Sequence, residues 1–411
     1  MNMEIGINLE RLQKDICDIG QIGCDPNGGI SRPSFSQADL EAREWLKSRL
    51  RDAELKIRED GAGNIFGRRE GTGKVIMTGS HIDTVLNGGL YDGALGVLTA
   101  LECIRCIDEA GFRITRPLEV VSFTDEEGNL VGDFLGSRAF TGQLSRETLE
   151  KGITPFGHTL AEILKNTDFS IAGILEAHRS RPDIEAFLEV HIEQGPVLET
   201  ESVSLGLVDK FAGKRYWLCS FLGKSNHAGT TPFELRKDAF LGLADFALKA
   251  THYVARNHYG SLLTVGKIRA YPGAFSIIPG RTDFTLDFRS TSPEALKDIE
   301  HNVRVLAAET AAARGLEFTF QTVDQTDPVS VSPRILNILK STCDKLGYSF
   351  LSLPSGAGHD AQILADITDS GMIFIPCEDG VSHSPEEKIN WDDLEKGANL
   401  LLHTLLALAA G

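Results

Sequence analysis

The sequence predicts an α/β protein, a helix-covered mixed sheet that is interrupted by a smaller α+β domain. Through the first 200 residues, short apolar runs alternate with segments of helical periodicity, which is the order of βαβ units. The middle of the chain is instead typical of a compact unit of strands and helices. With 411 residues, the chain is also longer than one ordinary hydrophobic core needs.

The elements expected before and after the middle of the chain follow from the spacing of apolar residues. A helix over Ala94–Ala110 should end at Gly111, because glycine readily adopts the backbone conformation of a C-cap. A last helix, Trp391–Leu408, should begin after Asn390, whose side chain can cap it. The expected strands are Lys74–Met77, Leu118–Thr124, Ala186–His191 and Met372–Ile375.

The middle part carries a period-two signal. In Asp283–Arg289, the apolar Phe284, Leu286 and Phe288 alternate with polar residues, which places Arg289 on the polar face of a strand. The full set comprises strands over Arg215–Leu222, Leu262–Ile268, Asp283–Arg289 and Leu316–Thr322 and helices over Lys237–Asn257 and Pro293–Arg314. We therefore expect one domain from residues 1–208 and 329–411, and an inserted, ferredoxin-like α+β domain from residues 209–328.

The composition of the chain excludes several classes of binding partner. The formal charge is −17 and no basic stripe offsets it, so binding to nucleic acid or to an anionic membrane is not expected. No apolar run reaches the ~18–20 residues of a membrane span, and Met1–Arg11 lacks the pattern of a signal peptide. The seven scattered cysteines do not suggest a disulfide framework, and Cys103 and Cys106 are expected to pack in the core. These observations predict a cytoplasmic protein.

Polar clusters that could hold metal ions follow the expected strands. His81 comes after the first strand, and Asp83, two residues on, can accept a hydrogen bond from the imidazole nitrogen that does not bind metal. Asp92 stands beside Gly93, where a carboxylate can approach two cations. These residue types in this order are compatible with a metal site.

Two adjacent glutamates and two further histidines extend the pattern. In an extended chain Glu126 and Glu127 point to opposite sides, so one can bind metal while the other acts as a general base. His191 and His383 each follow or end another expected strand. Each cluster alone is more typical of a structural residue or a solvated turn. Their shared position at the carboxyl ends of strands, where open α/β sheets bind ligands, favours a metal site.

Seven segments in order give the chain a resemblance to one known family. They are HIDTV–YDGALGV, FTDEEG–FLGSRAFTG, EVHIEQGPVLE, NHAGTTPFELRKDA, IIPGRTDFTLDFRS, GAGHDAQILA and VSHSPEE. Together they resemble the M20 peptidase superfamily, and specifically its hydantoinase/carbamoylase branch, over nearly the whole chain. That branch holds N-carbamoyl-L-amino-acid hydrolases, allantoate amidohydrolases, ureidoglycolate amidohydrolases and β-ureidopropionases.

The resemblance implies a metal-dependent amidohydrolase with two divalent ions. His81 and His191 match the ligands of one ion, Glu127 and His383 match those of the other, and Asp92 matches the residue that bridges both. A His/carboxylate set without cysteine accepts Zn²⁺, Mn²⁺, Co²⁺ or Ni²⁺, so the sequence does not choose among them.

The resemblance also implies the reaction. Glu126 matches the general base, and hydrolysis of an N-carbamoyl (ureido) acid is the expected activity. Allantoate or ureidoglycolate hydrolysis and simple N-acyl amide hydrolysis are the alternatives within the enzyme class. A catalytically silent relative would be expected to lack a ligand or the base, and all of them are present here.

Four further residues match positions that hold polar groups of the substrate: Gln194, His227, Arg289 and His359. His227 would also stabilise the oxyanion, and in this family the equivalent histidine commonly reaches the active site of a neighbouring subunit. Because inserted domains of the family also mediate dimers, a homodimer is expected.

The subsite for a substrate carboxylate is where this chain departs from the family. Arg289 suits a carboxylate because its planar guanidinium can bind one through two hydrogen bonds, although an ion pair with Asp283 or Asp287 is the alternative. Ser276 stands where the family usually has an asparagine before the Ile-Ile-Pro-Gly segment. The shorter side chain implies a substrate of different shape or a water molecule in the gap.

Overall fold

A computed structural model describes residues 5–112 and 114–409 of the chain. The first four residues of the N-terminal segment Met1–Arg11 and the last two residues of the chain lie outside that description. The chain forms two compact units: Met1–Asp209 together with Ser330–Gly411, and Lys210–Val329 between them in the sequence.

The first unit is built on a mixed sheet, which has nine strands within the described residues. They are β1 (Lys56–Glu59), β2 (Ile65–Arg69), β3 (Val75–His81), β4 (Leu118–Phe123), β5 (Ile184–Ile192), β6 (Gly206–Phe211), β11 (Val329–Ser330), β12 (Leu351–Ser355) and β13 (Asp369–Ile375). The order is β1-β2-β4-β3-β5-β13-β6-β11, and β12 pairs with β6. The central strands β4, β3, β5 and β13 are parallel, and antiparallel pairs flank them.

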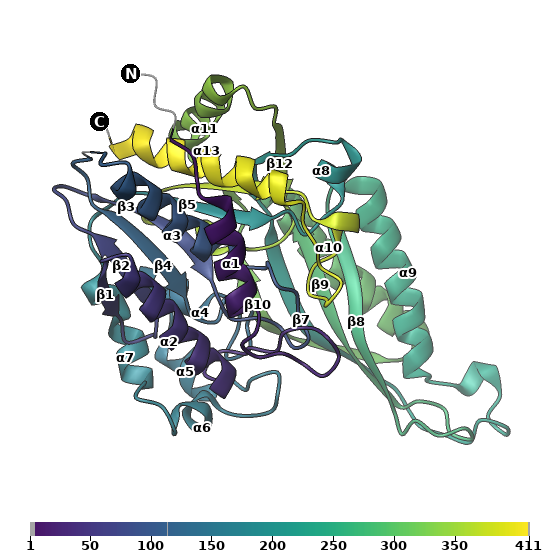
Figure 1. Cartoon of the computed structure of the whole chain (residues 1–411). Helices are drawn as coiled ribbons and strands as arrows, with labels where there is room; N and C mark the ends of the chain where they lie inside the picture. The colour runs from purple at the N-terminus through teal and green to yellow at the C-terminus, as the bar shows by residue number, and fades with distance from the viewer. Residues whose placement is uncertain (1–4, 113, 410–411) are drawn as a thin grey trace. The chain divides into compact units, whose positions relative to one another are not determined.

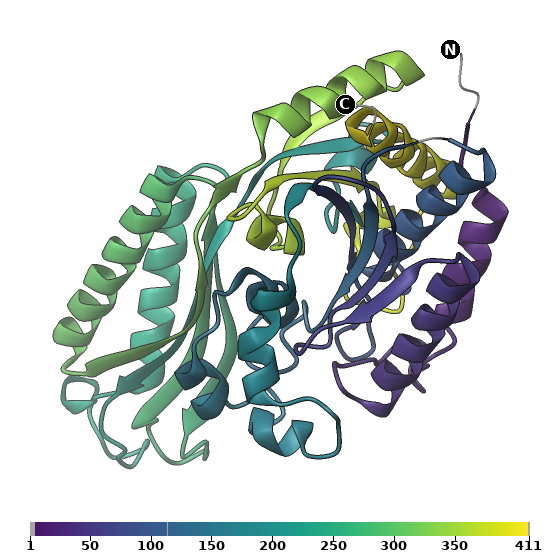
Figure 2. The same cartoon turned by 90° about the vertical axis from the view of Figure 1, so that its left-hand side faces the viewer.

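Helices lie on both sides of this sheet (Figure 2). The longer ones are α1 (Leu9–Ile19), α2 (Gln37–Asp52), α3 (Ala94–Glu109), α11 (Pro333–Leu346) and α13 (Trp391–Ala409). The shorter ones are α4 (Leu135–Thr141), α5 (Arg146–Lys151), α6 (Leu160–Leu164), α7 (Ile171–Glu176), α8 (Val197–Thr200), α12 (Asp360–Leu364), η1 (Ala177–Ser180) and η3 (Glu378–Gly380). Helix α3 packs between β3 on one side and α1 and α13 on the other (Figure 1). It is therefore buried on nearly every side, and the main core surrounds it.

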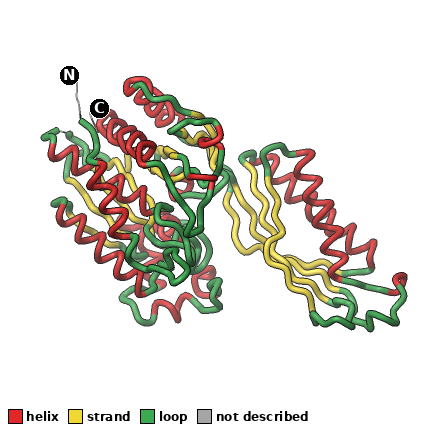
Figure 3. The backbone as a smooth tube through the Cα atoms, turned by 45° about the vertical axis from the view of Figure 1, so that its right-hand side comes forward, coloured by secondary structure: helices red, strands yellow, loops and turns green. Residues whose placement is uncertain are grey.

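The second unit is a four-stranded antiparallel sheet with helices on one face (Figure 3). Its strands are β7 (Gly213–Leu222), β8 (Leu262–Tyr271), β9 (Arg281–Ser290) and β10 (Glu317–Thr326), in the order β10-β7-β9-β8. Its helices are α9 (Ala239–Asn257), α10 (Pro293–Arg314) and the short η2 (Phe233–Leu235). Phe284, Leu286 and Phe288 alternate with more exposed residues along β9 and pack beneath α9 and α10. The succession of elements is that of ferredoxin-like units.

The predicted fold class is confirmed. Helix α10 has the expected bounds, and α3 ends just before Gly111. The side chain of Asn390 accepts a hydrogen bond from the backbone N–H of Asp392 at 2.9 Å, as a capping residue does. Cys103 and Cys106 are buried, in agreement with a core position. Within the described part of the chain, none of the helices combines the length and apolar character that crossing a membrane requires.

Candidate metal centre

The carboxyl ends of the four parallel strands bring the predicted ligands together. His81 is the last residue of β3, His191 lies next to the end of β5, and Glu127 follows β4 in a short loop. Asp92 lies in the loop from β3 to α3, and His383 lies in the loop after β13. Parallel neighbours end at the same edge of a sheet, so residues separated by up to 302 positions in the sequence meet there.

His81, His191 and Asp92 form one group of possible metal ligands, and all three are buried. The Nε2 atoms of His81 and His191 lie 3.6 and 3.2 Å from Oδ1 of Asp92. Their Nδ1 atoms face backbone carbonyl oxygens, of Asp83 at 3.1 Å and of Ile192 at 2.9 Å. A carbonyl oxygen only accepts hydrogen bonds, so Nδ1 carries the proton in each neutral ring, and both Nε2 lone pairs point to the carboxylate.

Asp92, Glu127 and His383 form a second group. Nε2 of His383 lies 3.4 Å from Oδ2 of Asp92 and 3.4 Å from Oε2 of Glu127. The two oxygens of Asp92 therefore face two different sets of ligands. That arrangement is suited to a carboxylate that bridges two cations.

The polar atoms at this edge fit bound cations better than they fit one another. Nε2 of His81 and Oε1 of Glu127 are buried and have no hydrogen-bond partner among the described residues. Burial, and then the neighbouring carboxylates, hold the pKa of Glu127 well above its usual range. Divalent ions would satisfy both lone pairs and neutralise the carboxylates, so the residues present fit a metal centre.

Protonation of the two buried histidines differs without metal. Burial, which is opposed by the Asp92 charge, lowers the pKa of His81 to about 4. Burial acts in the same direction on His191, but the carboxylates of Asp92 and Glu189 outweigh it and raise its pKa to about 9. The Asp92 carboxylate therefore acts more strongly on His191, whose Nε2 atom lies nearer to it than that of His81.

Glu126 reaches the same centre from the loop after β4. It is buried, and its Oε2 lies 3.7 Å from Nε2 of His81. The loop is not extended as predicted, because Asp125 has a left-handed backbone with φ of 57°. This turn sends both Glu126 and Glu127 towards the centre, whereas an extended segment would send them to opposite sides.

Asp83 supports the site in a different way from the one predicted. Its carboxylate lies 3.8 Å from Nδ1 of His81, and its backbone carbonyl accepts the imidazole hydrogen bond instead. The carboxylate accepts hydrogen bonds from the backbone N–H groups of Glu126 at 3.4 Å and Glu127 at 3.3 Å. Asp83 therefore orients both the histidine and the two glutamates.

Gln194 and His359, which the family resemblance links to substrate binding, also lie at this edge. Nε2 of Gln194 donates to Oδ2 of Asp92 at 2.7 Å, and its buried Oε1 has no partner among the described residues. The buried ring of His359 lies 4.7 Å from the ring of His191, and its Nε2 lies 3.0 Å from the hydroxyl of Ser355.

Glu387 is a buried residue of the centre that the sequence analysis did not single out. One of its oxygens accepts hydrogen bonds from the backbone N–H groups of Tyr91 at 2.7 Å and Asp92 at 3.1 Å. The other accepts from the hydroxyl of Ser382 at 3.1 Å. Gly89 leaves the space for this carboxylate, because a Cβ atom there would lie 2.1 Å from its Cδ. The VSHSPEE segment contains Glu387, but only the structure shows that it holds the Asp92 loop.

Replacing Glu387 with alanine is expected to lower metal affinity and kcat/KM by about 10–100-fold, the range for residues that orient metal ligands. The change leaves two N–H groups beside Asp92 without their acceptor. Metal titration and steady-state kinetics measure the effect. Glu386→Ala is the matched control, because Glu386 is the exposed neighbour in the same segment. Equal values for the two variants would contradict the role given to Glu387.

The metal-free protein is expected to lose stability as the pH rises from about 4 to 7. Burial raises the pKa of Asp83 to about 6 and that of Glu387 to about 7. In this window the folded protein holds more protons than the unfolded chain, so the free energy of unfolding falls with rising pH. Cations remove this penalty, and at a hundred times its Kd a metal ion adds about 2.7 kcal/mol.

The measurement is the melting temperature of chelated and metal-loaded protein between pH 5 and pH 8. We expect the gap between the two curves to widen as the pH increases. A gap of constant size across this range would contradict the assignment of these buried carboxylates to a metal centre.

His227 and Ser276 belong to the second unit, where their segments are paired. The N–H of Ala228 donates to the carbonyl of Ser276 at 2.8 Å, and both side chains are exposed. Nδ1 of His227 accepts a hydrogen bond from the N–H of Gly229 at 3.1 Å. In the neutral ring the proton is therefore on Nε2, which makes His227 a hydrogen-bond donor.

Arg289, also in the second unit, forms the ion pair that was considered as its alternative. Its Nη2 lies 3.0 Å from Oδ2 of Asp287 and 2.7 Å from the hydroxyl of Tyr216. Asp283, the other alternative partner, is 2.7 Å from Arg281 instead.

Known proteins resemble the chain over its whole length. Peptidase family M20/M25/M40 matches residues 77–407. An N-carbamoyl-L-amino acid amidohydrolase of Geobacillus stearothermophilus is 38% identical over 409 residues, which cover 98% of this chain and 100% of that protein. An allantoate amidohydrolase of Escherichia coli (strain K12) is 33% identical, with 95% of this chain and 96% of that protein covered. A crystal structure of an amidase of the hydantoinase/carbamoylase family from Burkholderia vietnamiensis covers 100% of both chains, with a TM-score of 0.88 and 33% identity.

The sequence match, the fold match and the ordered motifs agree with one another. The match to the family alone spans most of the chain, and the relatives cover the remainder. The chain belongs to peptidase family M20/M25/M40 and groups with its hydantoinase/carbamoylase branch.

Proposed function

We propose that this enzyme hydrolyses the ureido C–N bond of an N-carbamoyl amino acid or a related ureido acid, with two divalent metal ions as cofactors. The observation that carries the proposal is the position of Asp92, whose two oxygens face separate groups of possible ligands. His81 and His191 would hold one ion, and Glu127 and His383 the other. The ions are Zn²⁺, Mn²⁺, Co²⁺ or Ni²⁺, which this set of donors accepts.

The relatives support the enzyme class. The two relatives named above are amidohydrolases that act on non-peptide C–N bonds, and this chain is a hydrolase of that class. The substrates in their names differ, one being an N-carbamoyl-L-amino acid and the other allantoate. Both substrates carry a ureido group and a carboxylate. Allantoate or ureidoglycolate hydrolysis and N-acyl amide hydrolysis are therefore the alternatives to the proposed activity.

The chemistry divides among the residues of the chain. When bound, paired cations lower the pKa of a water molecule towards neutrality and polarise a substrate carbonyl. Glu126 accepts the proton of the attacking water and returns it to the leaving nitrogen as the C–N bond breaks. From an N-carbamoyl amino acid this yields the free amino acid and carbamic acid, which breaks down to ammonia and carbon dioxide. The Nε2–H of His227 is suited to stabilise the oxyanion formed by attack on the carbonyl.

A panel of substrates tests the proposal. Metal-loaded enzyme should release ammonia from N-carbamoyl amino acids, with allantoate, ureidoglycolate and N-acetyl amino acids tested beside them. Turnover of N-acetyl compounds, without ammonia from any ureido compound, would refute the proposed reaction. Turnover of allantoate alone would agree with the proposed metal site but would make allantoate the substrate in place of an N-carbamoyl amino acid.

Arg289 is proposed to bind the substrate carboxylate, with Ser276 beside the same substrate group. We expect Arg289→Gln to raise KM for an N-carbamoyl amino acid by about 10-fold or more, because hydrogen bonds to a charged group contribute about 1.5–3 kcal/mol. The KM for the corresponding amide, which lacks the carboxylate, should change little. Arg256→Gln, an exposed arginine of the same unit, is the matched control. An equal increase in KM for the acid and for the amide would show that Arg289 acts only through its ion pair with Asp287.

A homodimer through the second unit is the proposed assembly. Its edge strand β8 exposes Leu262 and Ile268, and α9 exposes Leu248, a distribution suited to a partner. Mixing inactive His227→Ala and Glu126→Gln subunits tests whether His227 acts across the dimer. Action across the dimer restores activity, because the mixed dimer then contains one intact site. If His227 acts within its own chain, no activity returns.

A further inference from the structure

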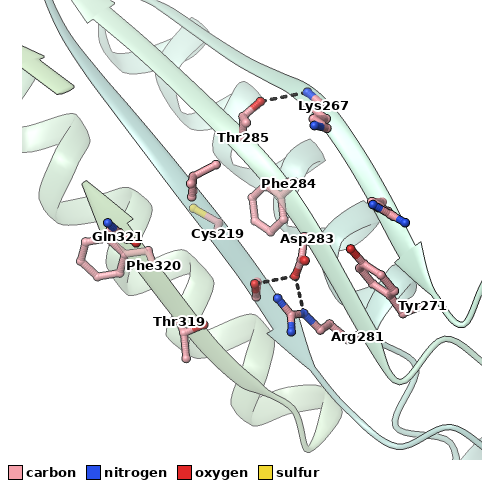
Figure 4. A pocket seen from close by; sticks show the side chains of 13 residues that line it. Cys219, Lys267, Tyr271, Arg281, Asp283, Phe284, Thr285, Thr319, Phe320 and Gln321 are labelled. Carbon is pink, nitrogen blue, oxygen red and sulfur yellow. Dashed lines mark hydrogen bonds and ion pairs between the residues drawn. The ribbon is translucent and has the colours of Figure 1, made fainter. Parts of the chain in front are cut away.

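A pocket of about 440 Å³ lies on the sheet of the second unit, and all four strands contribute to its lining (Figure 4). It occupies the open face of the sheet, since Arg281, Asp283 and Thr285 alternate along β9 with the buried Phe284 and Leu286. None of its lining residues belongs to the candidate metal centre. The volume lies within the ordinary range for small-molecule sites.

A β-bulge in the edge strand β8 determines which side chains line this pocket. Before the bulge the even-numbered Thr264 pairs with Asp287 on the open face, and after it the odd-numbered Arg269 pairs with Asp283 on that face. The open face of β8 therefore carries even-numbered residues before the bulge and odd-numbered residues after it. The backbone N–H of Lys267 donates to the hydroxyl of Thr285 at 2.9 Å inside the bulge. The extra residue turns Arg269 and Tyr271 to the open face, whereas a regular strand would turn them towards the helices.

The pocket has an excess of positive charge. Lys267, Arg269 and Arg281 line it together with a single carboxylate, that of Asp283, which pairs with Arg281 at 2.7 Å. Within the described residues no carboxylate lies within ion-pair distance of Lys267 or Arg269. The pocket lining thus has two more positive than negative charges, although the net charge of the whole chain is −17.

The rest of the same face shows that this excess is local. Near the other end of the strands, Lys214 lies 3.4 Å from Asp324 and Arg289 lies 3.0 Å from Asp287. Positive and negative charges match there one for one. The second unit as a whole, residues 210–329, has 15 basic and 12 acidic residues, which distinguishes it from the acidic remainder.

The cations and the apolar residues lie on different parts of the pocket wall. The guanidinium groups of Arg269 and Arg281 lie 5.0 and 5.5 Å from the centre of the Tyr271 ring, which they flank. Leu218 and Phe320 contribute apolar surface from β7 and β10, and they are 50% and 38% exposed. The wall therefore offers charge to oxyanions and an apolar surface to a short carbon chain.

We propose that this pocket is a second binding site, for a small aliphatic dicarboxylate. Two negative charges match the two cations without a carboxylate, and the methylene groups between them would lie against Leu218 and Phe320. Arginine pairs carboxylates through two hydrogen bonds, so Arg269 suits one carboxylate of the ligand, and the ammonium group of Lys267 suits the other. The proposal does not rest on the reaction proposed above.

Calorimetric titration of the metal-loaded, full-length protein with succinate tests the proposal. We expect saturable binding that Lys267→Gln and Arg269→Gln each weaken at least about 10-fold, and that Arg256→Gln leaves unchanged. Succinamide, which has the shape without the charge, should not bind. The kcat/KM of both pocket variants should stay within about twofold of the wild type, because neither residue belongs to the catalytic machinery.

Several results would overturn the proposal. Succinate binding that both pocket variants retain would place the ligand elsewhere, for example on the metal ions. Tighter binding of inorganic phosphate than of succinate would overturn the dicarboxylate assignment. A change in the oligomeric mass of the variants, with succinate affinity unchanged, would show that protein covers this face.

Discussion

Replacing Glu126 with glutamine is expected to lower kcat by about 10²–10⁴-fold while the protein keeps its metal ions, the range for loss of a general acid or base. Glutamine keeps the size and planar shape of the side chain. It cannot accept a proton from water, and it cannot return one to the leaving nitrogen. The effect should therefore fall on kcat, with only a small change in KM.

The structure separates Glu126 from the residues that could hold metal. One group of possible ligands contains Glu127, and none of the groups found in the described part of the chain contains Glu126. Burial raises the pKa of Glu126 well above its usual range, and the carboxylate of Glu127 adds to that effect. A carboxylate of this kind binds a proton readily, as the base in the reaction must.

Metal content by atomic emission and ammonia release by the same preparation test this prediction. Glu41→Gln is the matched control, because Glu41 is an exposed glutamate on α2. Unchanged turnover in Glu126→Gln would refute the assignment of the base. Loss of metal from Glu126→Gln would instead make Glu126 a ligand.

The parallel strands whose carboxyl ends carry the candidate metal centre could be predicted from the sequence. Strands such as β4 are buried along their whole length and appear as mainly apolar runs, and the helix α3 between β3 and β4 is mainly apolar as well. The short helices α4–α7 were not predicted, since five to seven residues give too little periodicity. Strand β8 was predicted to end at Ile268, three residues early, because the bulge after Val265 interrupts its alternation.

The site was predictable in its residue types and not in its supporting contacts. A histidine or carboxylate at a strand end is visible in the sequence, so the ligand candidates could be named. The hydrogen bonds of Asp83 to the Glu126 and Glu127 N–H groups depend on the left-handed backbone at Asp125. No local sequence pattern predicts that turn. Glu387 holds the Asp92 loop across 295 positions of sequence, and only the folded chain reveals that contact.

Replacing Asp92 with asparagine is expected to remove both metal ions and to abolish activity. Asp92 is the one residue shared by the two ligand groups that contain His81 and His383. Burial would raise its pKa, but His191, His383 and His81 outweigh burial and hold it well below the usual range, so the carboxylate stays ionised. The amide has no charge and only one oxygen, so it cannot neutralise two cations at once.

Metal stoichiometry separates a bridging Asp92 from a ligand of one ion. Asp92→Asn should bind neither ion at concentrations that load the wild type fully, whereas His383→Ala should lose one ion and keep the other. Asp168→Asn, at an exposed position, is the matched control. Melting curves in chelator show whether the variant is folded, because the comparison is then between two metal-free proteins. If folded Asp92→Asn keeps one ion per chain, Asp92 belongs to a single ligand group, and the two-ion centre on which the proposed reaction rests is refuted.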